Sequence, residues 1–138
     1  MSWRSQESLG TLPNLAFVIP NLCHDTHNKG CPISVGDEWL SEQVPRMLRA
    51  VGPRGLVVLT WDEDDKKSSG NHILTIFSGP LVKPGYVATQ PINHCTILRT
   101  LCEALGLTAF GAAASEAPIT DVWLQEGNGS LVQAPSRP

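Results

Sequence analysis

The sequence has no run of about 20 apolar residues, so no segment is expected to cross a membrane as a helix. It also has no excess of positive charge, because 10 lysines and arginines stand against 13 aspartates and glutamates, for a formal net charge of −3. A nucleic-acid partner and an anionic membrane surface are therefore disfavoured. The first ten residues are polar and show no apolar centre of a signal peptide.

The 138 residues, 41% of them apolar, fit one globular domain with a buried core. We expect residues 1–12 to form a loose arm and residues 124–138 a disordered tail, which leaves residues 13–123 for the folded part.

Only four cysteines are present, and their spacing limits how they can pair. Cys23 and Cys31 lie in a loop-like segment that a disulfide could close, but both could equally remain reduced thiols. Cys95 and Cys102 fall in a predicted helix, where seven residues span about 10 Å. A disulfide allows only about 7 Å between Cα atoms, so this pair is not expected to bridge. A Cys23–Cys31 bridge would indicate that the protein matures in an oxidising compartment.

Apolar runs and amphipathic segments alternate along the chain. We expect buried strands over residues 15–20, 56–61 and 72–79, and helices over residues 37–52 and 93–106. Pro45 is expected to kink the first helix or split it, and Gly52 to end it. From Thr108 onward we expect coil. This order predicts an α/β fold with a mostly parallel sheet and flanking helices.

Acidic residues and histidines follow the first two predicted strands. Asp25 and His27 come after the first strand, and Asp62 and Glu63 come directly after the second. Because function gathers at the carboxyl ends of parallel strands, we expect these loops to meet in one site. Two neighbouring carboxylates repel each other unless a cation offsets the repulsion, and hard oxygen ligands suit a divalent metal. An acidic turn surrounded by solvent is the alternative interpretation.

The histidines differ in what they can do. His27 shares a side of an extended loop with Asp25, so both can face one ion or phosphate, although an Asx-turn with an exposed histidine explains the pattern equally. His94 opens the second helix, where it can hold a phosphate oxygen or protonate a leaving group, or simply be half-buried. His24 is the weaker candidate, and His72 is expected to be structural.

Five segments, taken together, resemble one known family. They are "PNLCHDTHNKGCPISVGDEWL", "VVLTWDEDD", "NHILTIFSGPLVKPG", "NHCTILRTLCEALGL" and "APITDVW". In this order they resemble the C-terminal half of the bacterial phosphoesterases, a family of acid phosphatases, phosphatidylinositol-phosphate phosphatases and phospholipase C enzymes. The resemblance implies a partial alkaline-phosphatase-like fold and metal-dependent hydrolysis of a phosphate ester.

The resemblance also implies roles for single residues. Asp62 and Glu63 match the family's late metal-binding pair, whose metal is a divalent ion of unspecified identity. Asp25 and His27 match a loop that lines the active site, and His94 matches a histidine of the same site, although Cys95 stands where an aromatic residue is usual. Cys23 and Cys31 resemble a cysteine pair of secreted members, which favours the disulfide and a secreted or cell-envelope location.

One departure from the family pattern affects the expected activity. The family's early Glu-Asn metal pair and its Ser or Thr nucleophile precede every segment matched here, and the first thirteen residues contain no such motif. We therefore expect a C-terminal portion of a phosphoesterase, poorly active alone, or alternatively a non-catalytic remnant with residual metal or partner binding. An incomplete sheet would expose an edge and an apolar face, which predicts self-association.

Overall fold

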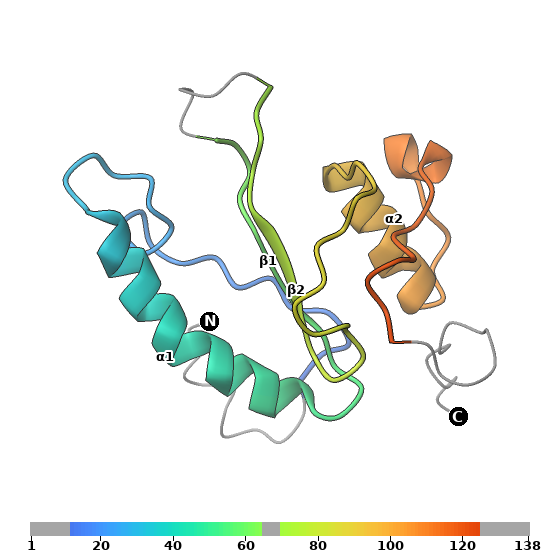
Figure 1. Ribbon diagram of the computed structural model, residues 1–138, viewed down its shortest axis with the longest axis horizontal. Coiled ribbons are helices and arrows are strands. Elements are labelled where there is room, and N and C mark those ends of the chain that lie inside the picture. The colour runs from blue at the N-terminus through green and yellow to red at the C-terminus, as the bar shows by residue number, and fades with distance from the viewer. Residues whose placement is uncertain (1–11, 65–69, 125–138) are drawn as a thin grey trace. The chain divides into compact units, whose positions relative to one another are not determined.

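The computed structural model describes residues 12–64 and 70–124, shown in colour in Figure 1. The chain divides into two units, Met1–Leu81 and Val82–Pro138, which are described one by one. The first contains α1 (Ile33–Val51), β1 (Val57–Thr60) and β2 (Thr75–Ser78), and the second contains α2 (His94–Ala104) and the 3₁₀ helix η2 (Gly111–Ser115). The predicted arm and tail lie almost wholly outside the described residues.

Helix α1 follows Pro32 and runs without a break through Pro45 to Gly52, whose φ of 75° ends it. The predicted split into two short helices at Pro45 is therefore wrong. Pro45 removes the hydrogen bond to the carbonyl of Ser41, but both residues are exposed, so water can satisfy that carbonyl. One face of α1, marked by Gly36, Gln43 and Met47, is buried.

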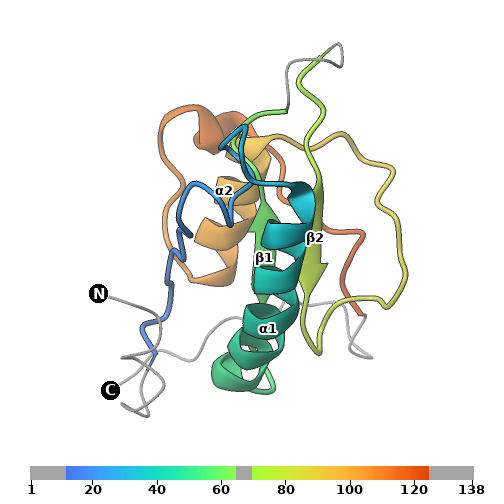
Figure 2. The ribbon, with the colours of Figure 1, turned by 90° about the vertical axis from the view of Figure 1, so that its left-hand side faces the viewer.

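Strands β1 and β2 form a two-stranded antiparallel sheet in which Val58 pairs with Phe77. Helix α1 contacts β1, and the two elements are closest where the helix ends and the strand begins (Figure 1; a second view is Figure 2). The mixed α/β character is confirmed, but the mostly parallel sheet is not found among the described residues. The error has a physical reason: a continuous apolar run identifies a buried strand without stating its direction. Here β1 and β2 follow one another in the chain and pair antiparallel.

The segment 15–20, predicted as a buried strand, is irregular in the structure. Phe17 is 79% exposed and Ile19 is 85% exposed. Among the described residues no strand pairs with this segment, so its apolar side chains have no sheet neighbour to pack on.

The second unit begins its helix as the sequence predicts. Asn93 is the N-cap of α2, and its Oδ1 accepts a hydrogen bond from the backbone N–H of Thr96 at 2.9 Å. Thr96 Oγ1 in turn accepts from the N–H of Asn93 at 3.3 Å, which completes a reciprocal capping pair. Beyond α2, Gly111–Ser115 form η2 where we expected coil, because short 3₁₀ turns carry little signal in the sequence.

Candidate functional site

The loop between residues 21 and 31 is held at both ends. Asn21 Oδ1 accepts hydrogen bonds from the backbone N–H groups of Cys23 at 3.1 Å and His24 at 3.0 Å. Cys23 and Cys31 form a disulfide, with their Cα atoms 5.3 Å apart, whereas Cys95 and Cys102 are free thiols. The structure thus settles the pairing that the spacing alone left open.

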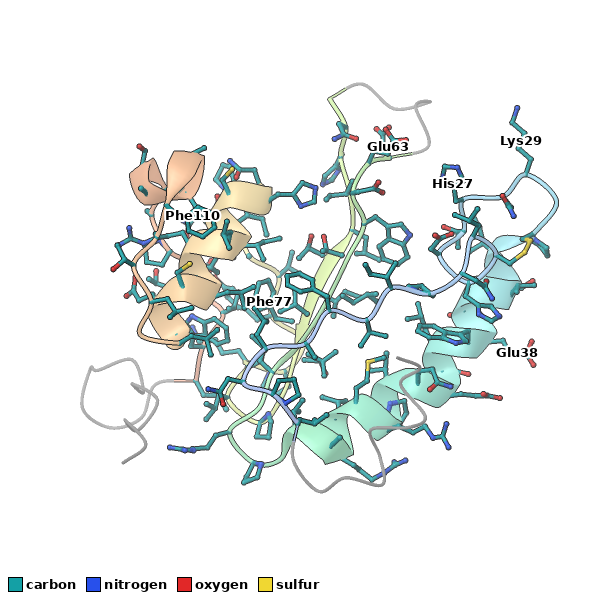
Figure 3. All side chains as sticks on the ribbon, turned by 180° about the vertical axis from the view of Figure 1, so that it is seen from behind. His27, Lys29, Glu38, Glu63, Phe77 and Phe110 are labelled. Carbon is teal, nitrogen blue, oxygen red and sulfur yellow. A yellow bond between two sulfur atoms is a disulfide. The ribbon has the colours of Figure 1, made fainter. Side chains whose placement is uncertain are left out.

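Within this loop, Asp25 and His27 form a local turn. Asp25 Oδ1 accepts a hydrogen bond from the backbone N–H of His27 at 2.9 Å, and His27 is exposed. This is the Asx-turn that the D-x-H pattern also allowed. The turn leaves the imidazole of His27 at the surface (Figure 3), where it can meet a ligand from solvent.

The acidic stretch after β1 is likewise at the surface. Asp62 and Glu63 are exposed, and Asp62 Oδ1 accepts a hydrogen bond from the N–H of Glu63 at 3.0 Å. Asp64 donates its backbone N–H to Asn71 Oδ1 at 2.8 Å, which ties the two sides of the hairpin connection together. In Figure 3, Glu63 and His27 both lie at the end of the unit where α1 begins.

A tryptophan joins the two loops. The indole Nε1 of Trp61 donates to the backbone oxygen of Asp25 at 3.1 Å and to Thr26 Oγ1 at 3.3 Å, and both contacts are partly buried. The loop after residue 20 and the loop after β1 are therefore brought together, as the sequence predicts, although the first is preceded by an irregular segment. The role of Trp61 was missed. Its only signal is a large side chain with one N–H donor directly before the acidic pair.

The described residues include the type of ligand atom that a metal ion needs, but too few ligands to hold one. Asp62 and Glu63 offer the hard oxygen atoms that divalent cations prefer. However, in the described part of the chain no group of three or more His, Cys, Asp or Glu side chains is placed to hold a metal. These residues alone therefore do not complete a metal site.

The other three histidines differ in their positions and contacts. His94 is exposed at the first position of α2 and belongs to the second unit, whereas Asp25 and His27 belong to the first. The ring of His24 stacks on Trp39, with centroids 5.6 Å apart and an interplanar angle of 16°. His72 is exposed and precedes β2 rather than beginning it.

A second polar cluster lies in the second unit and involves Lys83, Tyr86 and Asp121. Tyr86 donates its hydroxyl to Asp121 Oδ2 at 3.0 Å, and this hydrogen bond raises the pKa of the phenol above its ordinary value. Lys83 Nζ donates to the backbone oxygen of Asp121 at 2.8 Å and lies 4.9 Å from the centroid of the tyrosine ring. The cluster fastens residues 83–86 to the segment after η2.

No helix in the described parts of the chain is long and apolar enough to cross a membrane.

Comparison with known proteins gives a family and two relatives. The Phosphoesterase family matches over residues 3–108. A phosphatidylinositol-3-phosphatase of Mycobacterium tuberculosis is 42% identical over 113 residues, which are 81% of this chain and 36% of that protein. An acid phosphatase of Aspergillus fumigatus is 27% identical over 105 residues, 72% of this chain and 23% of that protein.

The chain thus spans about a third of the length of the mycobacterial relative and less of the fungal one. No solved structure matches. The order of the segments around the two joined loops and the match over residues 3–108 lead to one conclusion: this chain belongs to the Phosphoesterase family.

Proposed function

We propose that the chain is the C-terminal portion of a phosphate-ester hydrolase and that the two joined loops form part of its active site. The observation that carries this proposal is the pair of hydrogen bonds from Trp61 to the Asp25–Thr26 backbone and hydroxyl. It joins the Asp25 and His27 turn to the strand end that bears Asp62 and Glu63. Family membership supports the reaction class, and the names of both relatives denote phosphatases.

The residues take different roles in this proposal. Asp62 and Glu63 contribute two ligands to a divalent metal, whose other ligands come from elsewhere in the complete domain. The metal, when bound, supplies positive charge that activates a nucleophile and neutralises the phosphate. Asp25 and His27 line the substrate site from the facing loop.

His94 is proposed to act on the phosphate from the second unit. It opens α2, whose N-terminal N–H groups carry partial positive charge and attract anions. An imidazole at that place can hold a phosphate oxygen or protonate the leaving group. The Ser or Thr nucleophile of the covalent mechanism is proposed to lie outside this chain.

The substrate is a phosphate ester, either a small molecule or a phospholipid headgroup, as the names of the two relatives suggest. A secreted or cell-envelope location is proposed as well. The Cys23–Cys31 disulfide supports it, because such bridges persist in oxidising compartments.

The test is a chimera in which this chain replaces the matched 113 residues of the mycobacterial relative. Hydrolysis of p-nitrophenyl phosphate is measured with added Mg²⁺, Mn²⁺ or Ca²⁺ and with a chelator. We expect activity that the chelator removes and that the Asp62→Ala/Glu63→Ala variant lacks. Asp37→Ala/Glu38→Ala is the matched control, because it removes an exposed Asp-Glu pair from the first turns of α1 instead.

The second candidate function is a non-catalytic remnant that binds a metal or partner. This candidate does not require a complete metal site, and the described residues hold no group of three or more metal-ligating side chains. A chimera that folds and melts cooperatively but hydrolyses nothing would support the remnant. Activity that survives the loss of both Asp62 and Glu63 would instead exclude the metal role of these two residues.

A further inference from the structure

Thr26, between Asp25 and His27, has an unusual backbone conformation. Its φ is 69°, in the left-handed region that β-branched residues rarely adopt. Such a conformation is unfavourable and persists only where the surroundings enforce it. The turn that carries both candidate side chains is therefore strained and must be held by its neighbours.

Helix α1 supplies one of the neighbours. Gly36 is buried, and a Cβ atom built on it would lie 2.8 Å from Thr26 Cγ2 and 2.9 Å from the carbonyl oxygen of His24. The first turn of α1 thus packs directly against the strained turn, and only glycine leaves room for it. This contact blocks movement of the turn on the side of the helix.

Trp61 supplies the other neighbour. Its indole N–H is shared between Asp25 O and Thr26 Oγ1, the two acceptors that flank the strained φ angle. Since Trp61 directly precedes Asp62, any motion that breaks these contacts separates the turn from the acidic end of β1.

We propose that Trp61 is a positioning residue: its indole N–H holds the Asp25–His27 turn in the strained conformation and keeps it beside the Asp62–Glu63 strand end. Trp61 itself does not touch substrate in this scheme. The assignment of the turn to an active site rests on the proposed function, whereas the mechanical role of Trp61 does not.

The experiment uses the full chain and compares Trp61→Phe with Trp123→Phe. The control is matched, because Trp123 Nε1 also makes a partly buried hydrogen bond, donated to Ile119 O at 2.7 Å in the second unit. Amide hydrogen exchange at His27, whose N–H bonds to Asp25 Oδ1, reports whether the turn opens. We expect exchange about threefold to tenfold faster in Trp61→Phe, the effect of losing one hydrogen bond, and no change at His27 in Trp123→Phe.

A second readout separates positioning from general stability. The imidazole signals of His27 are followed by NMR during titration with inorganic phosphate. We expect the wild-type chain and Trp123→Phe to respond at the same phosphate concentration, and Trp61→Phe to require several-fold more. If the wild type shows no response, the assignment of this turn to a phosphate site fails, and the exchange rates still decide the role of Trp61.

A further variant, Thr26→Val, tests the same contact without changing the size of the ring at residue 61. It keeps the indole and the shape of residue 26 but removes the Oγ1 acceptor, and we expect exchange at His27 about twofold to fivefold faster. Exchange at His27 that is equal in wild type, Trp61→Phe and Thr26→Val would overturn the proposal.

Discussion

The two units bury their apolar residues very differently. In the second unit, which is the smaller, the described core comprises Ile97, Cys102, Ala113, Ile119 and Val122. The first unit contributes only Met47 to the buried apolar residues among those described, while Phe17 and Ile19 are almost fully exposed. Length and apolar content therefore do not determine burial; an apolar side chain is buried only where another element packs on it.

A buried hydroxyl of the second unit makes two hydrogen bonds. Thr100 Oγ1 donates to Thr96 O at 2.8 Å and accepts from the N–H of Ile119 at 2.9 Å. One hydroxyl thus links α2 to the segment after η2. The first unit relies instead on a disulfide and on the Trp61 contacts, which hold a loop rather than a core.

The largest effect is expected from Ile119→Ala in the second unit. Ile119 is 1% exposed, and truncating such a residue leaves a cavity that destabilises by about 2–5 kcal/mol. Urea unfolding followed by amide exchange in α2 measures the loss, and Leu107→Ala, at a site 59% exposed, is the control. Met47→Ala in the first unit should lose less. An equal loss there would contradict the claim that the core belongs mainly to the second unit.

The next effect is expected from the disulfide of the first unit. Cys23→Ser/Cys31→Ser opens a loop with a sequence separation of 8, and the lost chain constraint is worth about 2–3 kcal/mol. Protection of the amides of residues 23–27 should fall, while that of α2 stays unchanged. Cys95→Ser, which removes a free thiol, should change neither region. Unaltered protection of the loop in the double variant would show that Trp61 and Gly36 suffice to hold it.

Local signals in the sequence predicted much of this structure. Asn93 and Gly52 mark helix boundaries because a side-chain oxygen at the N-cap and a residue free to adopt positive φ are local requirements. The meeting of the two loops was predicted, and the family resemblance favoured the Cys23–Cys31 bridge that the spacing had left open. The helix boundaries depend on residues near one another in the chain, whereas the meeting of the loops was expected because each follows a predicted strand.

Other features that depend on distant neighbours were not predicted. The apolar pattern of residues 15–20 calls for a strand, but a strand needs a partner, and none of the described strands supplies one. The direction of β2 depends on how the chain turns after Thr60, which the pattern of apolar residues does not encode. Trp61 was overlooked because its partners are Asp25 and Thr26, more than thirty residues earlier.

A smaller effect on stability, but a distinct one on association, is expected from Phe17→Ser/Ile19→Ser. Both side chains are exposed, so the free energy of unfolding should change by no more than about 0.5 kcal/mol. If this segment drives the self-association that an uncovered apolar surface predicts, sedimentation velocity should show the double variant less associated than the wild type. Val87→Ser, at a site 81% exposed in the second unit, tests whether any exposed apolar residue has the same effect.

The smallest effect concerns Tyr86, the single tyrosine of the chain. The hydrogen bond to Asp121 raises the pKa of the Tyr86 phenol in the folded state. The stability that this hydrogen bond contributes is therefore complete at pH values below 10.0, the pKa of the phenol in the unfolded chain. That contribution is lost as the pH rises through the higher folded pKa. Tyr86→Phe should therefore unfold with the same pH dependence as wild type below pH 10 and should lack the additional decline in stability above it.

The absorbance of the tyrosinate, followed against pH in the wild-type chain and in Asp121→Asn, measures the pKa of Tyr86 directly. A lower pKa of Tyr86 in Asp121→Asn would show that Asp121 causes the shift. An unchanged pKa would contradict that explanation.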